Sequence, residues 1–309
     1  MPPAYGQLPP YGQWAPKPGC IPLRPLSAGE VIGGAFSAVF RNARVVLPLS
    51  AVVAVLQAII SVLIQLPARS SSGQLVDNSD PNNPRFHWGR ILAASTGGLG
   101  GSLISAVFAA VLTGMLIVVV TEDVVGRRAD FDLVWRKVRS RLWRLIGLSL
   151  VVGVLEFGGL LLCLAPGIWL WGIWAVAVPA LMVENRGIGG SLGRSRSLVD
   201  GMFWRVWGVR ALGYLTCIGI SIGVGLVFGV IGLATTGSAS GVRVSGGYLD
   251  TSSVSAGTIV VLALGSAVAA WLVTPIKAGI DSLLYVDQRM RKENLAVDLQ
   301  AAAAGARRG

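Results

Sequence analysis

Six long apolar stretches, separated by short polar or basic segments, restrict the folds open to this chain more than any other feature. A helix needs about 20 largely apolar residues to cross the hydrocarbon core of a bilayer, and these stretches approach or exceed that length. They cover residues 45–66, 91–120, 145–164, 168–183, 206–235 and 258–285. Only 13% of the 309 residues are charged and 53% are hydrophobic, a composition far from that of a soluble domain. We therefore predict an all-α integral membrane protein with six transmembrane helices.

Low-complexity segments flank this domain at both ends. Residues 1–25 contain eight prolines, a composition that favours a disordered, partly polyproline II arm over a packed core. Residues 296–309 combine an alanine run with Arg307 and Arg308, and we expect a flexible basic tail there. The predicted membrane domain is thus residues 26–295.

The distribution of Lys and Arg predicts how the spans are oriented. Twenty of the 26 cations fall in segments predicted on one side of the membrane, and only four fall in the alternate loops. Those four are Arg69, Arg85, Arg90 and Arg243. Because cytoplasmic loops are enriched in Lys and Arg, we predict a plasma-membrane protein with both termini in the cytoplasm. The same rule explains the net charge of +11, so we expect no nucleic-acid partner.

Three amphipathic, mostly basic segments run directly into an outward apolar span. In the clearest, residues 130–144, Phe131, Val134, Trp135, Val138 and Leu142 follow helical spacing, and cations occupy the opposite face. Such a helix is typical of one that lies flat at a bilayer surface. We therefore expect contact with anionic lipid. The cations assigned to that lipid surface are Arg127, Arg128, Arg136, Lys137, Arg139, Arg141, Arg144, Arg194, Arg196 and Arg205.

The other two amphipathic helices are expected before the first and fifth spans. One begins at Ser27, where Ser27 and Glu30 have the spacing of a capping box, and the other lies within residues 184–205. The three junctions read Val39-Phe40-Arg41, Leu142-Trp143-Arg144 and Phe203-Trp204-Arg205. This agreement predicts three repeated units, each an interfacial helix followed by a two-span hairpin. The alternative is that every outward span needs an aromatic and basic anchor at its entry.

Two spans carry small residues at four-residue steps, a pattern that lets helices approach closely in lipid. The helix-packing positions are Gly97, Gly101 and Ser105 in the second span and Gly213, Ser221, Gly225 and Gly229 in the fifth. We expect close contact between helices of one chain, with contact between copies as the alternative.

Charged side chains inside the spans are the candidates for chemistry. Glu156 lies eleven residues beyond Leu145, about 16 Å along a helix at 1.5 Å per residue, and so falls near the middle of the bilayer. A carboxyl group there is either functional or a protonated group that hydrogen-bonds a neighbouring helix. Arg210 and Lys277 are its candidate partners, and Lys277 is also expected to pair with Asp281 one turn further on.

Signatures of a catalytic or metal site are missing from the sequence. The chain has one histidine, His87, and three cysteines, two of which lie inside apolar stretches. No phosphate-binding loop, HExxH motif or GxSxG motif occurs. We therefore expect no enzyme activity, no metal and no cofactor.

Three stretches together resemble a bacterial family of membrane proteins related to the membrane domain of glycerophosphoryl diester phosphodiesterases. The stretches are Pro25-Leu26-Ser27-Ala28-Gly29-Glu30-Val31, Pro179-Ala180-Leu181-Met182-Val183-Glu184 with Ser191-Leu192-Gly193-Arg194-Ser195, and Leu283-Leu284-Tyr285-Val286-Asp287-Gln288-Arg289-Met290-Arg291. In that family the phosphodiester-cleaving activity belongs to a separate soluble domain, for which this chain has no segment of sufficient length. The resemblance implies the membrane fold and not the activity.

These patterns leave three hypotheses for function. The first is a non-enzymatic membrane module that organises anionic lipid or partner proteins through its basic cytoplasmic helices. The second is a transporter of a small or lipidic substrate, with Glu156 as the coupling residue. The third, which the missing motifs disfavour, is a lipid-modifying enzyme.

Overall fold

The computed structural model describes residues 20–22, 24–71, 76–77, 85–86, 107–108, 110–124, 131–162, 164–236, 243–245, 248–250 and 256–295. Almost all of them are helical, as predicted. The helices are α1 (Ala28–Arg41), α2 (Ala43–Ser71), α4 (Phe131–Arg139), α5 (Leu142–Leu162), α6 (Leu164–Ile173), α7 (Ala177–Glu184), α8 (Ile188–Val199), α9 (Phe203–Thr236) and α10 (Ala256–Lys292). Residues 107–108 and 110–124 are also helical.

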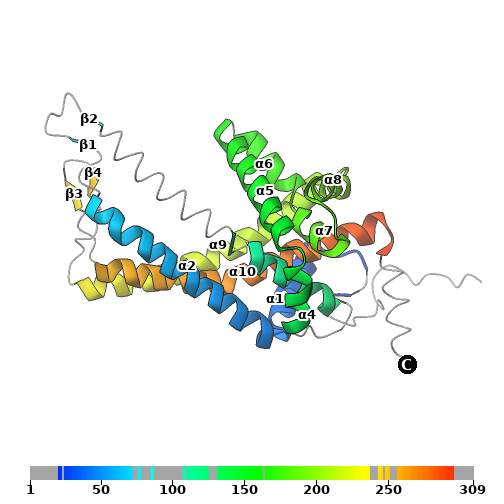
Figure 1. Cartoon of the computed structure of the whole chain (residues 1–309), viewed down its shortest axis with the longest axis horizontal. Helices are drawn as coiled ribbons and strands as arrows, with labels where there is room; N and C mark the ends of the chain where they lie inside the picture. Colours follow the sequence, from blue (N-terminus) through cyan, green and yellow to red (C-terminus); the bar gives the residue numbers. More distant parts are fainter. Residues whose placement is uncertain are drawn as a thin grey trace, which may run out of the picture.

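Two short antiparallel ladders lie in the segments between apolar spans. β1 (Val76–Asp77) pairs with β2 (Arg85–Phe86), and β3 (Arg243–Ser245) pairs with β4 (Tyr248–Asp250). Both ladders lie at the end of the molecule far from α7 and α8 (Figure 1).

Four segments of the described chain are long and apolar enough to cross a membrane, which identifies a helical membrane protein. They are Ala43–Ile60, Ala165–Glu184, Phe203–Gly232 and Val260–Lys292. The predicted span 145–164 falls on α5, whereas most of the predicted span 91–120 lies outside the described residues. It stays a prediction that the chain has six spans, that both termini are cytoplasmic and that the fold contains a threefold repeat.

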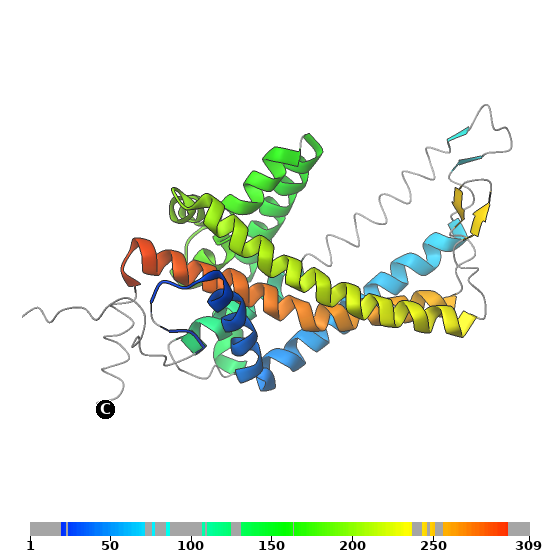
Figure 2. The same ribbon diagram turned by 180° about the vertical axis from the view of Figure 1, so that it is seen from behind.

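The long helices α9 and α10 run beside one another for much of their length, and α2 also packs against α10 (Figure 2). α9 has 34 residues and α10 has 37, which corresponds to about 51 Å and about 55 Å at 1.5 Å per residue. α10 therefore exceeds the hydrocarbon thickness of about 30 Å. It does not end near the predicted residue 285, because packing against α1, α7 and α8 continues the helix to Lys292.

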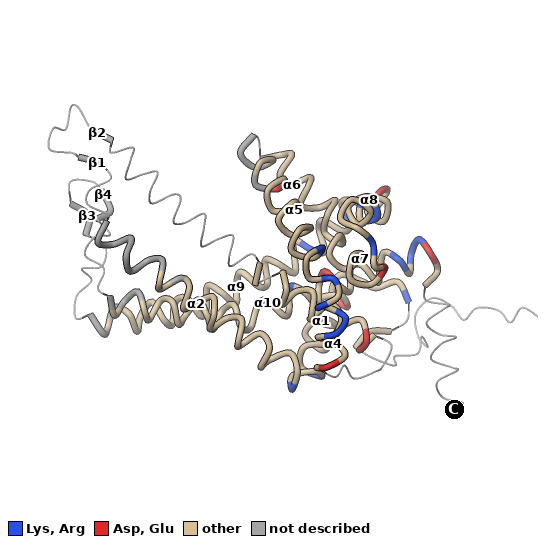
Figure 3. Tube along the Cα trace, viewed as in Figure 1, with Lys and Arg blue, Asp and Glu red and all other residues tan. Residues whose placement is uncertain are grey.

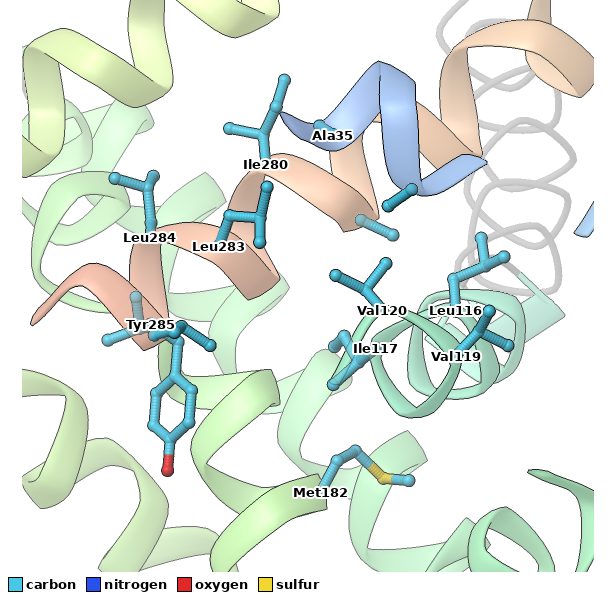
Figure 4. Close-up of a cluster of buried hydrophobic side chains, with 14 of the residues drawn as sticks. Ala35, Leu116, Ile117, Val119, Val120, Met182, Ile280, Leu283, Leu284 and Tyr285 are labelled. Carbon is cyan, nitrogen blue, oxygen red and sulfur yellow. The ribbon is translucent and has the colours of Figure 1, made fainter. Parts of the chain in front are cut away.

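The main core surrounds the C-terminal half of α10. Ile280, Leu283 and Leu284 point into it from α10, and Ile117 and Val120 come from the helical segment of residues 110–124 (Figure 4). α1 packs across the same part of α10, where a Cβ on Gly279 would lie 3.0 Å from that of Ala35. The backbones of these two helices therefore approach closely.

The predicted hairpin between residues 145 and 183 differs from expectation at its turn. The gap between the predicted spans 145–164 and 168–183 predicts a turn at Ala165-Pro166-Gly167, but these residues lie inside α6, and α5 ends earlier, at Leu162. Pro166 is the third residue of α6, where its missing N–H would have had no helical acceptor. The proline thus starts the second helix instead of forming the turn.

The return stretch 168–183 is a second correction, because it is two helices and not one. α6 ends at Ile173 and α7 begins at Ala177, with a turn at residues 174–176. In an unbroken helix, the ring of Pro179 would clash with the carbonyl group of Ala175. The break places Pro179 in the first turn of α7, where a proline is tolerated.

The three amphipathic helices bury more of their apolar faces in protein than a purely interfacial helix would. α1 buries Val31, Ala35 and Val39, and α4 buries Val134 and Val138. α8 buries Ser191, Ser195, Leu198 and Val199. Phe131 and Trp135 of α4 remain exposed beside the buried valines, so the apolar stripe of this helix is divided between the core and the surroundings.

Packing also begins before the predicted start of the membrane domain. Cys20 and Ile21 are buried, and the side chain of Ile21 lies against Gly34 of α1. Burial, together with the neighbouring Asp123 carboxylate, raises the pKa of the Cys20 thiol to about 12. The boundary at residue 25 is therefore too late by about five residues, because Cys20 and Ile21 supply apolar side chains to α1.

Candidate functional site

A buried ion pair joins α9 to α10 within the apolar spans. Arg210 Nε lies 3.0 Å from Asp281 Oδ1, and Tyr214 donates its hydroxyl to Asp281 Oδ2 at 3.2 Å. The Arg210 guanidinium also stacks 4.5 Å from the centroid of the Trp171 ring. Lys277 completes the group, with its Nζ 5.1 Å from the Tyr214 ring centroid. We call these five residues the intramembrane cluster.

The break between α6 and α7 makes this arrangement possible. Ala175 N–H donates to Gly172 O instead of Trp171 O, so the Trp171 carbonyl has no helical donor and accepts from Arg210 Nη1. The next free carbonyl, that of Ile173, accepts from Ser195 Oγ at 2.6 Å. Side chains from α9 and α8 thus satisfy backbone groups that a membrane could not solvate.

The intramembrane cluster contains three of the four predicted intramembrane polar residues. The expected pairing of Lys277 with Asp281 is wrong, since Asp281 pairs with Arg210, whose planar fork can donate two hydrogen bonds to one carboxylate. Glu156 makes no ion pair within the described residues, but it lies near enough to Arg210 and Asp281 to interact with both electrostatically.

A second polar group gathers around Asp287, whose side chain is fully buried near the C-terminal end of α10. Asp287 accepts hydrogen bonds from Leu26 N at 2.8 Å, Arg205 Nη2 at 3.1 Å and Arg291 Nε at 3.0 Å. Arg205 and Arg291 also donate to the Leu26 carbonyl, at 2.5 Å and 2.8 Å. One carboxylate therefore ties together α10, α9 and the chain before α1.

A neighbouring set of contacts ties α7 and α8 to the same end of α10. Glu184 accepts from Tyr285 Oη at 2.7 Å and from Arg194 Nε at 2.8 Å. Glu293 pairs with Arg194 and, at 2.8 Å, with Arg289. Partial burial opposes ionisation of Glu293, but the hydrogen bonds from Arg289 and Arg194 outweigh it and hold the pKa of this carboxyl below its ordinary value.

Together these contacts form the α10 end cluster, which we define as Glu184, Arg194, Arg205, Tyr285, Asp287, Arg289, Arg291 and Glu293. Apart from Arg205 and Glu293, its members lie in the stretches that carried the family resemblance. The structure thus brings three stretches, far apart in sequence, to one place. Asp287 and Tyr285 were not predicted as site residues, because beside Arg289 and Arg291 they resemble an ordinary solvated helix end. Glu184 was not predicted either, because it directly follows the predicted span 168–183.

The predicted lipid-surface cations divide into exposed and internally bound groups. Arg136, Arg139 and Arg196 are exposed, whereas Arg194 and Arg205 belong to the α10 end cluster. Lys137 pairs with Glu122 at 2.6 Å, Arg141 donates to the Met182 carbonyl, and Arg144 donates to the Asn185 carbonyl at 3.5 Å. Arg127 and Arg128 lie outside the described residues. Charged residues gather in α1, α4, α7, α8 and the end of α10 (Figure 3).

The three aromatic residues at the predicted junctions are among the most exposed large apolar side chains in the described chain. Trp143 is 86% exposed, Trp204 77% and Phe40 64%. Trp143 and Trp204 are the second residues of α5 and α9, and Phe40 lies near the end of α1, just before α2 begins at Ala43. Exposed aromatic rings beside cations are typical of the membrane–water interface.

The helix-packing predictions can be followed only in the fifth span, since Gly97, Gly101 and Ser105 lie outside the described residues. A Cβ on Gly213 would lie 2.6 Å from Ile280 Cδ1, so α9 and α10 approach closely there. Gly225 and Gly229 have no such neighbour within 4 Å, and Ser221 lines a cavity together with Gly225. The predicted stripe therefore serves helix contact at one end and borders open space further along.

Within the described ranges, no group of three or more His, Cys, Asp or Glu side chains could hold a metal ion. The fold and the two clusters define a helical membrane protein with a buried ion pair in its apolar part. Its charged end, as we call it below, consists of α1, α4, α7, α8 and the C-terminal end of α10. The chain matches none of the family models, curated proteins and solved structures with which it was compared.

Proposed function

We propose that this protein is a non-enzymatic plasma-membrane module that organises anionic lipids or partner proteins at its charged end. In this proposal both termini are cytoplasmic, and the membrane fold is of the kind implied by the resemblance described above. The observation that carries the proposal is the combination of exposed cations and exposed aromatic rings at that end, where Arg136, Arg139 and Arg196 accompany Trp143 and Trp204. Such a surface is suited to phosphate groups and to the acyl boundary beneath them.

The lipid content of purified protein tests this function. We expect the full chain, extracted from native membranes, to carry more anionic lipid than the bulk membrane. Changing Arg136, Arg139 and Arg196 to Gln should reduce that enrichment at least fivefold, since each cation near an anionic surface contributes about 1 kcal/mol, or about a factor of five. The matched control changes Arg69, Arg85 and Arg90 to Gln, which removes equal charge from loops predicted on the other side. Equal loss in both variants would contradict the proposal.

The orientation has its own test. A fluorescent protein fused to either terminus should resist protease added outside intact cells, because both termini are proposed to be cytoplasmic. Cleavage of either fusion from outside would overturn this orientation and, with it, the location proposed for the charged end.

Transport is a second candidate, favoured by the intramembrane cluster and by Glu156 beside it. Charged groups within spans often mark substrate or proton pathways, and a broken helix such as α6–α7 occurs at many transport sites. In reconstituted vesicles, Glu156→Gln should abolish proton-coupled flux of a substrate. Flux that survives this substitution would exclude Glu156 as the coupling residue.

A further inference from the structure

A groove lies between α9 and α10 in the apolar part of the molecule. Its volume is about 440 Å³, and it extends along α10 from Leu262 to Lys277. Fifteen residues of helix correspond to about 22 Å at 1.5 Å per residue. That length exceeds half of a hydrocarbon core of about 30 Å, the depth that the acyl chains of one lipid occupy. The groove can therefore accommodate an acyl chain lying along the two helices.

The walls of the groove favour an acyl chain over a polar solute. Phe228, Leu262 and Val273 line it together with small residues such as Gly225 and Ala270. Ser221 and Ser266 also line it, but their hydroxyl groups donate to the carbonyl oxygens of Cys217 and Ala263, at 3.0 Å and 2.8 Å. Their donors are therefore committed to their own helices, and the remaining polar side chains of the wall, Thr274 and Lys277, both lie at one end of the groove.

One end of the groove carries a positive charge. Lys277 lines the end nearest the charged part of α10, and no acidic side chain of the described chain lines the groove. Among the described residues, the Lys277 ammonium contacts the Tyr214 ring and has no carboxylate in ion-pair contact, since Asp281 pairs with Arg210. A cation within a membrane span is costly unless an anion accompanies it. The groove is thus complementary to a molecule with a long apolar part and an anionic head.

We propose that this groove binds one anionic phospholipid, with an acyl chain between α9 and α10 and its phosphate paired with Lys277. The site is separate from the lipid surface proposed for the charged end, because none of Arg136, Arg139 and Arg196 lines it. It requires only that α9 and α10 lie in a membrane.

Native mass spectrometry of the full chain, with phosphatidylglycerol or phosphatidylcholine added in mild detergent, tests the head-group contact. The unmodified chain should retain one phosphatidylglycerol about tenfold more tightly than phosphatidylcholine, the size expected for one charge-assisted contact. Lys277→Gln should remove this preference and Lys277→Arg should restore it. A preference unchanged by Lys277→Gln would overturn the assignment of Lys277.

Filling the groove tests the acyl site. Gly225→Leu should lower retention of both lipids about tenfold or more, because its side chain would enter the groove. Gly229→Leu is the matched control, since Gly229 has equally open space and does not line the groove. If Gly225→Leu does not fold, Ala270→Phe fills the groove from the opposite wall. Undiminished retention of lipid by a folded variant whose groove is filled would overturn the site. The site would also be overturned if the substitution abolished a dimer of this chain and left lipid binding unchanged.

The two lipid proposals can fail independently. The Arg136, Arg139 and Arg196 variant should keep the single lipid bound in the groove, and Gly225→Leu should keep the anionic enrichment at the charged end. If the variant that lacks Arg136, Arg139 and Arg196 loses the single bound lipid, that lipid binds at the charged end and not in the groove.

Discussion

The two halves of α10 belong to one continuous helix but lie in different surroundings. In the N-terminal half, Val260, Leu262 and Leu264 are exposed, as expected for residues that face lipid. In the C-terminal half, Ile280, Leu283 and Asp287 are buried by α1, α7, α9 and the segment of residues 110–124. The position of the N-terminal half therefore depends on apolar contacts with neighbouring helices. Hydrogen-bonded charged side chains fix the position of the C-terminal half.

Asp287→Ala is expected to have the largest effect, because it removes the acceptor that joins three segments in the buried half. Arg205, Arg291 and Leu26 N would each lose a partner, and we expect a loss of about 3 to 5 kcal/mol in the free energy of unfolding. Thermal unfolding in detergent, followed by circular dichroism, measures it. The control is Asp132→Ala, which breaks only the exposed pair with Arg136. Equal losses of unfolding free energy in the two variants would mean that the buried carboxylate of Asp287 contributes no more to stability than the exposed one of Asp132.

Breaking the ion pair of the intramembrane cluster should have the next largest effect. Arg210→Gln leaves Asp281 buried without its cation, and we expect a loss of about 3 kcal/mol. The double variant Arg210→Met with Asp281→Leu should recover most of this loss, since it removes both members of the ion pair and not one alone. A simple sum of the two single effects would show that the residues do not interact.

A smaller effect should distinguish two glycines of α9. Gly213→Leu would force its side chain against Ile280, and we expect a cost of about 1 to 3 kcal/mol. A Cβ at Gly229 meets no atom within 4 Å, so Gly229→Leu should change the stability little. If both substitutions cost the same, the contact at Gly213 does not position α9 against α10.

The smallest effect should appear on acidification. Because the pKa of Glu293 is lowered in the folded protein, its stabilising contribution is fully present above the ordinary glutamate pKa of about 4.3. The contribution is then lost as the pH falls through the lower, folded-state value. Glu293→Gln should therefore lower the melting temperature slightly at pH 7 and leave it unchanged at the acid end. The same difference at both ends would contradict a role for the Glu293 charge.

The local signals in the sequence were sufficient for several elements of the fold. The capping box of Ser27 and Glu30 is confirmed, with both reciprocal hydrogen bonds present. The apolar stretches predicted at 45–66, 206–235 and 258–285 correspond to α2, α9 and α10. These features depend on residues close together in the chain, so spacing and composition suffice to find them.

The partners of the charged residues could not be predicted in the same way. Lys277 and Asp281 stand one turn apart, which favours a pair, but Arg210 reaches Asp281 from another helix with better hydrogen-bond geometry. Likewise, Asp287 lies within a basic helix end that resembles a solvated one. Its burial depends on the chain around Leu26, 261 residues away. Tertiary contacts determine which partner a charged residue has and whether it is buried, and residue spacing alone does not predict these contacts.

The contact between Leu26 and Asp287 has a consequence for biosynthesis. Chains emerge from the ribosome N-terminus first, so α1 is made long before its anchor on α10. The backbone groups of Leu26 can find their partners on Asp287 and Arg291 only when α10 has been synthesised. α10 is therefore needed to dock α1, and a chain that stops before Asp287 should reach the membrane with α1 undocked. We expect quality-control proteases to degrade such truncated chains, because α1 is not packed against α10.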